Sequence, residues 1–208
     1  GVSVAYASGV HTGLEAAVRR NIMGGLGLMT EQISQQNHDA FGCNGWEISA
    51  HANSAPDHEP IQGLQYSDAA YEELNNSLVR RIGTLNCGHV ASPIILGVTR
   101  PQYTAAELEQ FRQDNEKGVT FEGRHYTGYE ATQMQRRMER AIRAQKRRVL
   151  LAGPEDAAPR KSRLVLLQQE YRSFSDGVGL RTEDERLEVS GFGPKQMAEV
   201  MKTVEKYS

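Results

Sequence analysis

The sequence lacks most of the features that would place it in a specialised class of protein. It has two cysteines in 208 residues, Cys43 and Cys87; they could form one bridge but make no disulfide framework. No stretch of eighteen apolar residues is present, so we expect no membrane span. The opening residues have no basic flank and no long apolar run, so we expect no signal peptide. The chain begins with Gly1 instead of Met, which is compatible with a chain cut from a longer protein.

Neither sign of charge dominates overall, since 24 Lys/Arg and 26 Asp/Glu give a net charge of only -2. The distribution of charge is more informative. Residues 1–130 carry 8 Lys/Arg and 15 Asp/Glu, residues 131–163 carry 10 and 3, and residues 164–208 carry 6 and 8. A mildly acidic body is therefore followed by a strongly basic segment and a nearly neutral tail.

The hydrophobic periodicity predicts an α+β fold, with several helices packed around a small sheet of short strands and a basic helical extension. We expect a core domain over residues 1–126, and over 127–208 a basic helix, a second helix and a C-terminal strand–helix segment packed on the core. Helical patterns cover residues 11–38, 104–118, 127–153, 160–175 and 193–208, and residues 67–83 combine a loop with a modest helix. Strand patterns cover residues 46–52, 92–98, 119–121 and 124–126, with a further short strand within 182–193.

The first helical segment has an ambiguous middle. Thr12 and Glu15 have the spacing of a capping box, which would start a helix there. The glycines of "GGLG", residues 24–27, then leave three alternatives open: a kink, close packing against a neighbour, or a stop and restart at Thr30. Apolar residues continue through this segment at helical spacing and include Leu14, Ala17, Val18, Ile22, Leu26 and Met29.

Two irregular segments, "SAHANSAPDH" and "NCGHVASP", concentrate the residues best suited to bind a metal. They contribute His51, His58, Cys87 and His89, and zinc takes four nitrogen or sulfur ligands. The spacing matches no common zinc signature, so ordinary hydrogen-bonded loop residues are an alternative. A third interpretation is a nucleophile, with Cys87 activated by His51 or His58. We assign no catalytic residue, because Glu47, Asp57 and Glu59 are the only nearby acid–base candidates and form no obvious pair.

A strongly basic helix is predicted after residue 127. Its cations could neutralise nucleic-acid phosphates or dock on an acidic partner, although a solvated helix face is the ordinary explanation for a charge-rich helix. No aromatic residue is interleaved among them, which argues against base stacking. The cations are Arg136, Arg137, Arg140, Arg143, Lys146, Arg147 and Arg148.

Four segments occur in this order along the chain: "LEAAVRRNIMGGLGLMTEQIS", "WEISAHANSAPDHEPIQGLQYS", "NCGHVASPIILG" and "YTGYEATQMQRRMERAIRAQKR". Together they resemble the phage minor capsid protein family, type 2. One departure from that pattern is Pro60-Ile61, where an aromatic residue would be expected before Gln62-Gly63, and it affects only local packing.

The resemblance implies a minor structural protein of a tailed-phage or prophage head, located in the virion and in the bacterial host cytoplasm during assembly. Its implied partners are the portal protein and other capsid proteins inside the head, and the basic helix could touch packaged DNA. The His/Cys positions would be family signature residues, with a structural zinc ion as a secondary hypothesis. The alternatives are a zinc-dependent hydrolase or toxin-like effector domain carried by the virion, and a stand-alone DNA-binding module.

Overall fold

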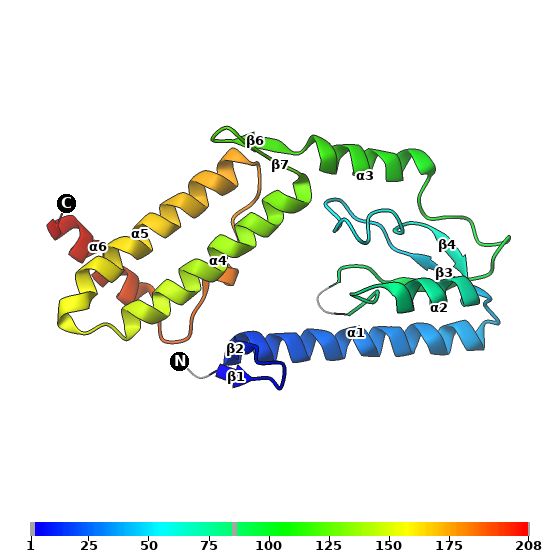
Figure 1. The fold of residues 1–208 in the computed structure, drawn as a ribbon, viewed down its shortest axis with the longest axis horizontal. Coiled ribbons are helices and arrows are strands. Elements are labelled where there is room, and N and C mark those ends of the chain that lie inside the picture. Colours follow the sequence, from blue (N-terminus) through cyan, green and yellow to red (C-terminus); the bar gives the residue numbers. More distant parts are fainter. Residues whose placement is uncertain (1–2, 85–86, 208) are drawn as a thin grey trace. The chain divides into compact units, whose positions relative to one another are not determined.

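The computed structural model describes residues 3–84 and 87–207 and confirms the α+β architecture (Figure 1). The chain forms two compact units, Gly1–Asn115 and Glu116–Ser208. The first contains β1 (Ser3–Ala5), β2 (His11–Gly13), α1 (Leu14–Ala40), β3 (Gly45–Ile48), β4 (Gln65–Ser67), α2 (Asp68–Ser77), β5 (Ala91–Ile94) and most of α3 (Ala105–Lys117). The second contains β6 (Val119–Phe121), β7 (Arg124–Tyr126), α4 (Gly128–Leu150), α5 (Pro154–Gly177), the 3₁₀ helix η1 (Asp184–Leu187) and α6 (Pro194–Tyr207).

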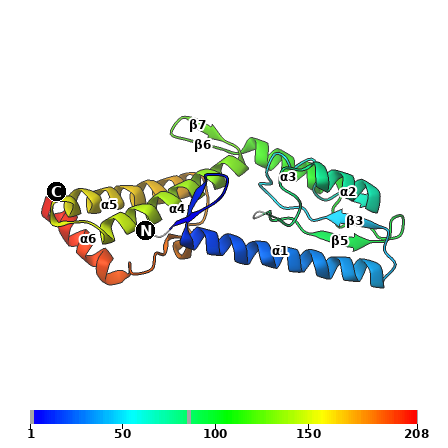
Figure 2. The ribbon, with the colours of Figure 1, turned by 60° about the horizontal axis from the view of Figure 1, so that its bottom comes forward.

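A three-stranded antiparallel sheet organises the first unit. Its strand order is β4-β3-β5, so β3 pairs on both sides. Helix α1 runs alongside β5 (Figure 2). Helix α2 follows β4 directly, and the Ser67 hydroxyl caps it by accepting from the backbone N–H of Ala70 at 3.3 Å.

Helix α1 is one continuous helix, so the alternative of a stop and restart at the glycines does not apply. Its N-cap is Gly13 without a side-chain cap, and the capping box expected at Thr12 was therefore wrong. The apolar stripe predicted from the sequence is largely exposed. Ala17 is buried, but the large residues of the stripe are between 46% and 58% exposed; they are Leu14, Val18, Ile22, Leu26 and Met29.

One of the three glycines explains how closely α1 approaches the rest of the unit. A Cβ on Gly27 would lie 2.2 Å from the carbonyl oxygen of Gly83, so only glycine fits there. A Cβ on Gly24 or Gly25 would meet no packing neighbour within 4 Å. The close packing anticipated for this glycine segment therefore applies to Gly27 alone.

The interior of the first unit is unusually polar. Its large buried apolar side chains, among the residues described, are Trp46, Ile48, Ile82 and Ile94. Buried polar residues outnumber them and gather beside the sheet; they are His38, Glu47, Ser54, His58, Gln62, Asn75, His89 and Asn115. Stability of this unit therefore depends on how these polar groups are satisfied.

The second unit has a conventional apolar core. Helices α4 and α5 pack against each other, and α6 packs on α5 (Figure 1). The core includes Ile142, Leu164, Tyr171 and Val200, all 1% exposed or less. The predicted capping box of Thr127 and Glu130 is present at the start of α4. The strand predicted within residues 182–193 was wrong: that segment forms η1 and a single bridge from Val189 to Phe192.

The β6–β7 hairpin, which the sequence grouped with the first segment, belongs to the second unit. It turns at Glu122 and Gly123, which have φ of 49° and 77°, as a two-residue hairpin requires. Among the described residues, no helix combines the length and the apolar character needed to cross a bilayer.

Two glycines of α1 provide a matched test of the close approach. Gly25→Ala should raise the free energy of unfolding by about 0.5–1 kcal/mol, because alanine is the better helix former and nothing occupies its side-chain space. Gly27→Ala should lower it, because the new methyl group meets the Gly83 carbonyl. Urea unfolding followed by the fluorescence of Trp46, the only tryptophan of the chain, reports on this unit. Equal effects of the two substitutions would contradict the contact.

Candidate metal centre

Strand pairing brings the two predicted ligand segments together. Strands β3 and β5 are antiparallel, and Ile48 at the end of β3 pairs with Ala91 at the start of β5. The loop that leaves β3 and the loop that enters β5 therefore lie at the same end of the sheet. Backbone contacts join them, since the Ser49 N–H donates to the Val90 carbonyl at 2.8 Å.

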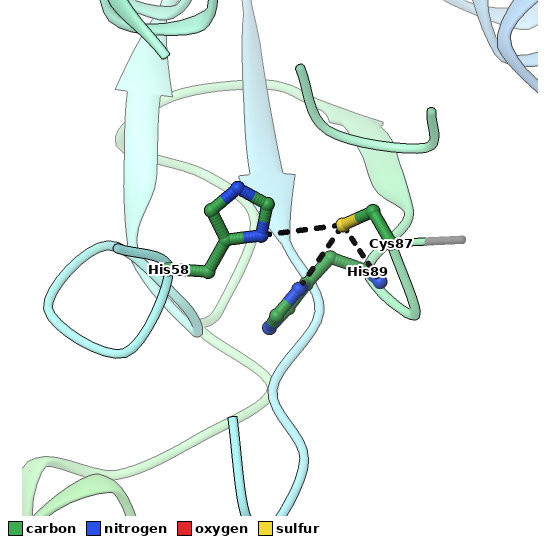
Figure 3. A group of neighbouring side chains, drawn as sticks. All are labelled: His58, Cys87 and His89. Carbon is green, nitrogen blue, oxygen red and sulfur yellow. Dashed lines mark hydrogen bonds between the residues drawn. The ribbon is translucent and has the colours of Figure 1, made fainter. Parts of the chain in front are cut away.

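Three of the four predicted ligands form a tight group at this point (Figure 3). The Sγ of Cys87 lies 3.3 Å from Nδ1 of His58 and 3.4 Å from Nδ1 of His89. One donor atom from each residue falls within 4.8 Å of the other two. A tetrahedral zinc ion, with bonds of about 2.3 Å to sulfur and about 2.0 Å to nitrogen, separates its sulfur and nitrogen ligands by roughly 3.5 Å. The observed separations are close to that value.

The outer nitrogens of both rings have oxygen acceptors. Nε2 of His58 lies 2.9 Å from the carbonyl oxygen of Arg80. Nε2 of His89 lies 3.1 Å from Oε1 of Gln62 and 3.4 Å from the Ser54 hydroxyl. A ring that donates Nε2–H to such an acceptor leaves the lone pair of Nδ1 free to bind a metal, and metal-binding histidines are usually held in this way. Both rings therefore turn a basic nitrogen toward Cys87.

Electrostatics keep His89 uncharged. Burial, together with the neighbouring His51 and His58, lowers its pKa from 6.5 to about 4. The side chain is only 2% exposed. A neutral imidazole is the form that binds a metal, so His89 is in its ligand form at neutral pH.

His51, the fourth predicted ligand, lies beside this group but outside it. Its ring stacks on that of His89 with centroids 4.3 Å apart, and its Nδ1 lies 2.9 Å from the carbonyl oxygen of Ala52. Gln62, which the sequence analysis did not single out, connects the two histidines: its Oε1 accepts the backbone N–H of His51 at 3.0 Å and faces His89. The Gln62-Gly63 dipeptide within the quoted segment was the only signal for it.

A pocket of about 240 Å³ adjoins the cluster within the first unit. It lies between α1, α2 and the residues that lead into β5, and Cys87 and His89 both line it. Its apolar lining comes from Met23, Leu26, Trp46, Tyr71 and Ile82. Its polar lining includes Thr30, Glu31, Ser34 and Gln35.

The carboxylates considered as acid–base candidates are engaged elsewhere. Glu47 accepts from the side chain of Gln65 at 2.7 Å and from the backbone N–H of Gln102 at 3.0 Å. Asp57 pairs with Arg80 at 2.6 Å, and Glu59 accepts from Asn115 at 2.8 Å. None of the three carboxylates is among the residues that line the pocket. Cys43 and Cys87 are both free thiols, so the possible bridge between them is absent.

Comparison with known families identifies the chain. The family model for phage minor capsid protein 2 matches residues 2–176. The chain belongs to this family. The match spans both units and includes every residue of the metal-type cluster. No curated protein and no solved structure matches the chain.

The basic helix of this minor capsid protein is α4, and at least two of its seven predicted cations are used within the second unit. Lys146 is buried, with Nζ donating to the Leu187 carbonyl at 2.8 Å. Arg143 donates to the carbonyl oxygen of Arg186. Arg147 is partly buried. The cations exposed on α4 are Arg136, Arg137, Arg140 and Arg148.

The depressed pKa of His89 predicts how the metal-free protein responds to acid. As the pH falls, His89 binds a proton near pH 6.5 in the unfolded chain but only near pH 4 in the folded state. Stability due to neutral His89 is therefore complete above pH 6.5 and is lost as the pH falls through that window, by up to about 3 kcal/mol. His89→Gln should lack this loss. Urea unfolding in a chelator at pH 7, 5.5 and 4 measures it, and a wild-type-minus-variant difference that stays constant with pH would contradict the assignment.

Proposed function

We propose that this phage minor capsid protein is a minor structural component of a tailed-phage or prophage head, associated with the portal and the interior of the capsid. The observation that carries the proposal is the family match over residues 2–176. The engagement of Glu47, Asp57 and Glu59 in structural contacts supports a structural role over the alternative of a zinc-dependent hydrolase or effector domain. Its partners would be the portal protein and other capsid proteins.

Particle assembly tests this proposal directly. The chain would be expressed with the portal, scaffold and major capsid proteins of the same phage, and heads would be purified on a density gradient. We expect the chain to sediment with heads in few copies and to be lost when the portal gene is omitted. A chain that is never found in assembled heads would overturn the proposal.

We further propose that zinc is the metal held by His58, Cys87 and His89. The support is threefold: sulfur–nitrogen separations of 3.3 and 3.4 Å, acceptors for both outer nitrogens, and a neutral His89. A metal would also stabilise the first unit, whose apolar core is small. Small cores are commonly supplemented by metals or disulfides. Zinc would tie the two loops together at the end of the sheet.

The two free cysteines give a matched test of the zinc site. Cys87→Ser should abolish stoichiometric zinc binding and lower the melting temperature of the zinc-loaded protein. Zinc at about one hundred times its dissociation constant adds about 2.7 kcal/mol to the wild type, and this gain should vanish in the variant. Cys43→Ser should retain both zinc and stability. Elemental analysis and calorimetry provide the readouts, and equal metal content in the two variants would reject the site.

The exposed arginines of α4 are proposed to contact packaged DNA or an acidic protein surface. Simultaneous Arg136→Gln, Arg140→Gln and Arg148→Gln should weaken DNA binding and reduce the slope of log affinity against log salt by about 2–3, because each phosphate contact releases counterions. Arg19, Arg100 and Arg172 are also exposed and lie outside α4, so the matching triple glutamine variant is the control. DNA titrations at several salt concentrations measure both, and identical slopes in the two variants would reject a phosphate contact by α4.

A further inference from the structure

The three-residue ligand set leaves one coordination position without a protein donor. Zinc takes four ligands, and sites with three protein ligands keep the fourth for water or an exogenous group. Among the described residues, His58, Cys87 and His89 are the ones whose donor atoms converge. His51 is the nearest further candidate, but it presents a ring face to His89 and its Nδ1 is held by the Ala52 carbonyl at 2.9 Å.

Part of this site borders the pocket. Cys87, Gly88 and His89 form part of the pocket lining, whereas His58 does not and is only 1% exposed. Two of the three donor residues therefore belong to the pocket wall, and the third does not. The pocket of about 240 Å³ between α1 and α2 is therefore a space from which an outside group could reach a metal held by these residues.

The pocket wall indicates what kind of group would enter. Met23, Leu26 and Ile82, together with the rings of Trp46 and Tyr71, present apolar surface. A zinc ion with one thiolate and two neutral imidazoles keeps a net positive charge, which favours an anionic donor. Among the described residues of the lining, the one carboxylate is Glu31, which pairs with Arg81 at 3.4 Å. The combination suits an anion on an apolar stem.

We propose that the metal centre is a ligand-binding site: a small carboxylate with an apolar stem occupies the pocket and supplies the fourth donor to the metal. This inference rests on the metal site proposed above. The carboxylate oxygen binds the metal beside Cys87, and the stem lies against Trp46, Tyr71 and Ile82. The centre is then an open, exchangeable site, in contrast to a closed structural one.

Cobalt-substituted protein tests the proposal, because the visible absorption of Co²⁺ reports changes among its ligands. Phenylacetate should change this absorption and saturate at a concentration at least tenfold below that of acetate, which has the same carboxylate but no stem. Ser34 lines the pocket, and Gln36 is exposed on the same helix outside the lining. Ser34→Leu should fill the pocket and weaken phenylacetate binding at least tenfold, whereas Gln36→Leu should leave it unchanged.

The outcomes separate this inference from the zinc proposal. Stoichiometric Co²⁺ binding with no response to phenylacetate would reject the open site and leave the metal site standing. Failure to bind Co²⁺ would reject both. Phenylacetate binding that is indifferent to Ser34→Leu would reject the pocket as its location. A loss of Co²⁺ affinity greater than tenfold in His51→Ala would show that His51 completes the site and would also overturn the inference.

Discussion

The first unit depends on polar groups satisfying one another in its interior. Few large apolar side chains are buried there. Among the described residues of the unit, they are Trp46, Ile48, Ile82 and Ile94. Buried polar groups each cost about 1–3 kcal/mol when left without a partner. The chain meets this requirement with specific pairs, for example the Asn75 side-chain oxygen, which accepts the backbone N–H of Ile82 at 2.8 Å. The His58–Cys87–His89 group is the part of this interior whose metal-type donor atoms lie within 4.8 Å of one another, so it could hold a metal ion.

The two units are stabilised by different kinds of interaction. In the second unit apolar residues of α4, α5 and α6 meet in a continuous core. The basic residues of α4 consequently have two roles. Lys146 and Arg143 extend inward and satisfy carbonyl oxygens around η1, while Arg136, Arg137, Arg140 and Arg148 stay at the surface. Burial lowers the pKa of Lys146, because the charged form loses hydration there. A charge-rich helix is therefore not uniformly a binding face.

Short-range sequence patterns predicted most helices, but they did not predict the tertiary contacts. The Thr127–Glu130 box, the Glu122-Gly123 turn and the periodicity of α4 act over a few residues, so the sequence displays them directly. The exposure of the apolar stripe on α1 depends on which side of the helix approaches the rest of the unit. Part of that approach is Gly27 meeting Gly83, far away in sequence. The ligand types of the cluster were readable from composition. The exclusion of His51 and the part played by Gln62 depend on loop geometry that no spacing encodes.

The pairing of Ile48 with Ala91 has a consequence for how the first unit reaches one folded state. Sliding β5 along β3 by one residue would displace the preceding loop, which carries Cys87 and His89, by about 3.3 Å and would turn every side chain of β5 to the opposite face. Metal coordination tolerates distance errors of only about 0.2 Å. A chain with the strands mispaired could therefore not assemble the His–Cys–His donors. Binding of the proposed metal would therefore stabilise the native register of β5 on β3 and none of the neighbouring registers.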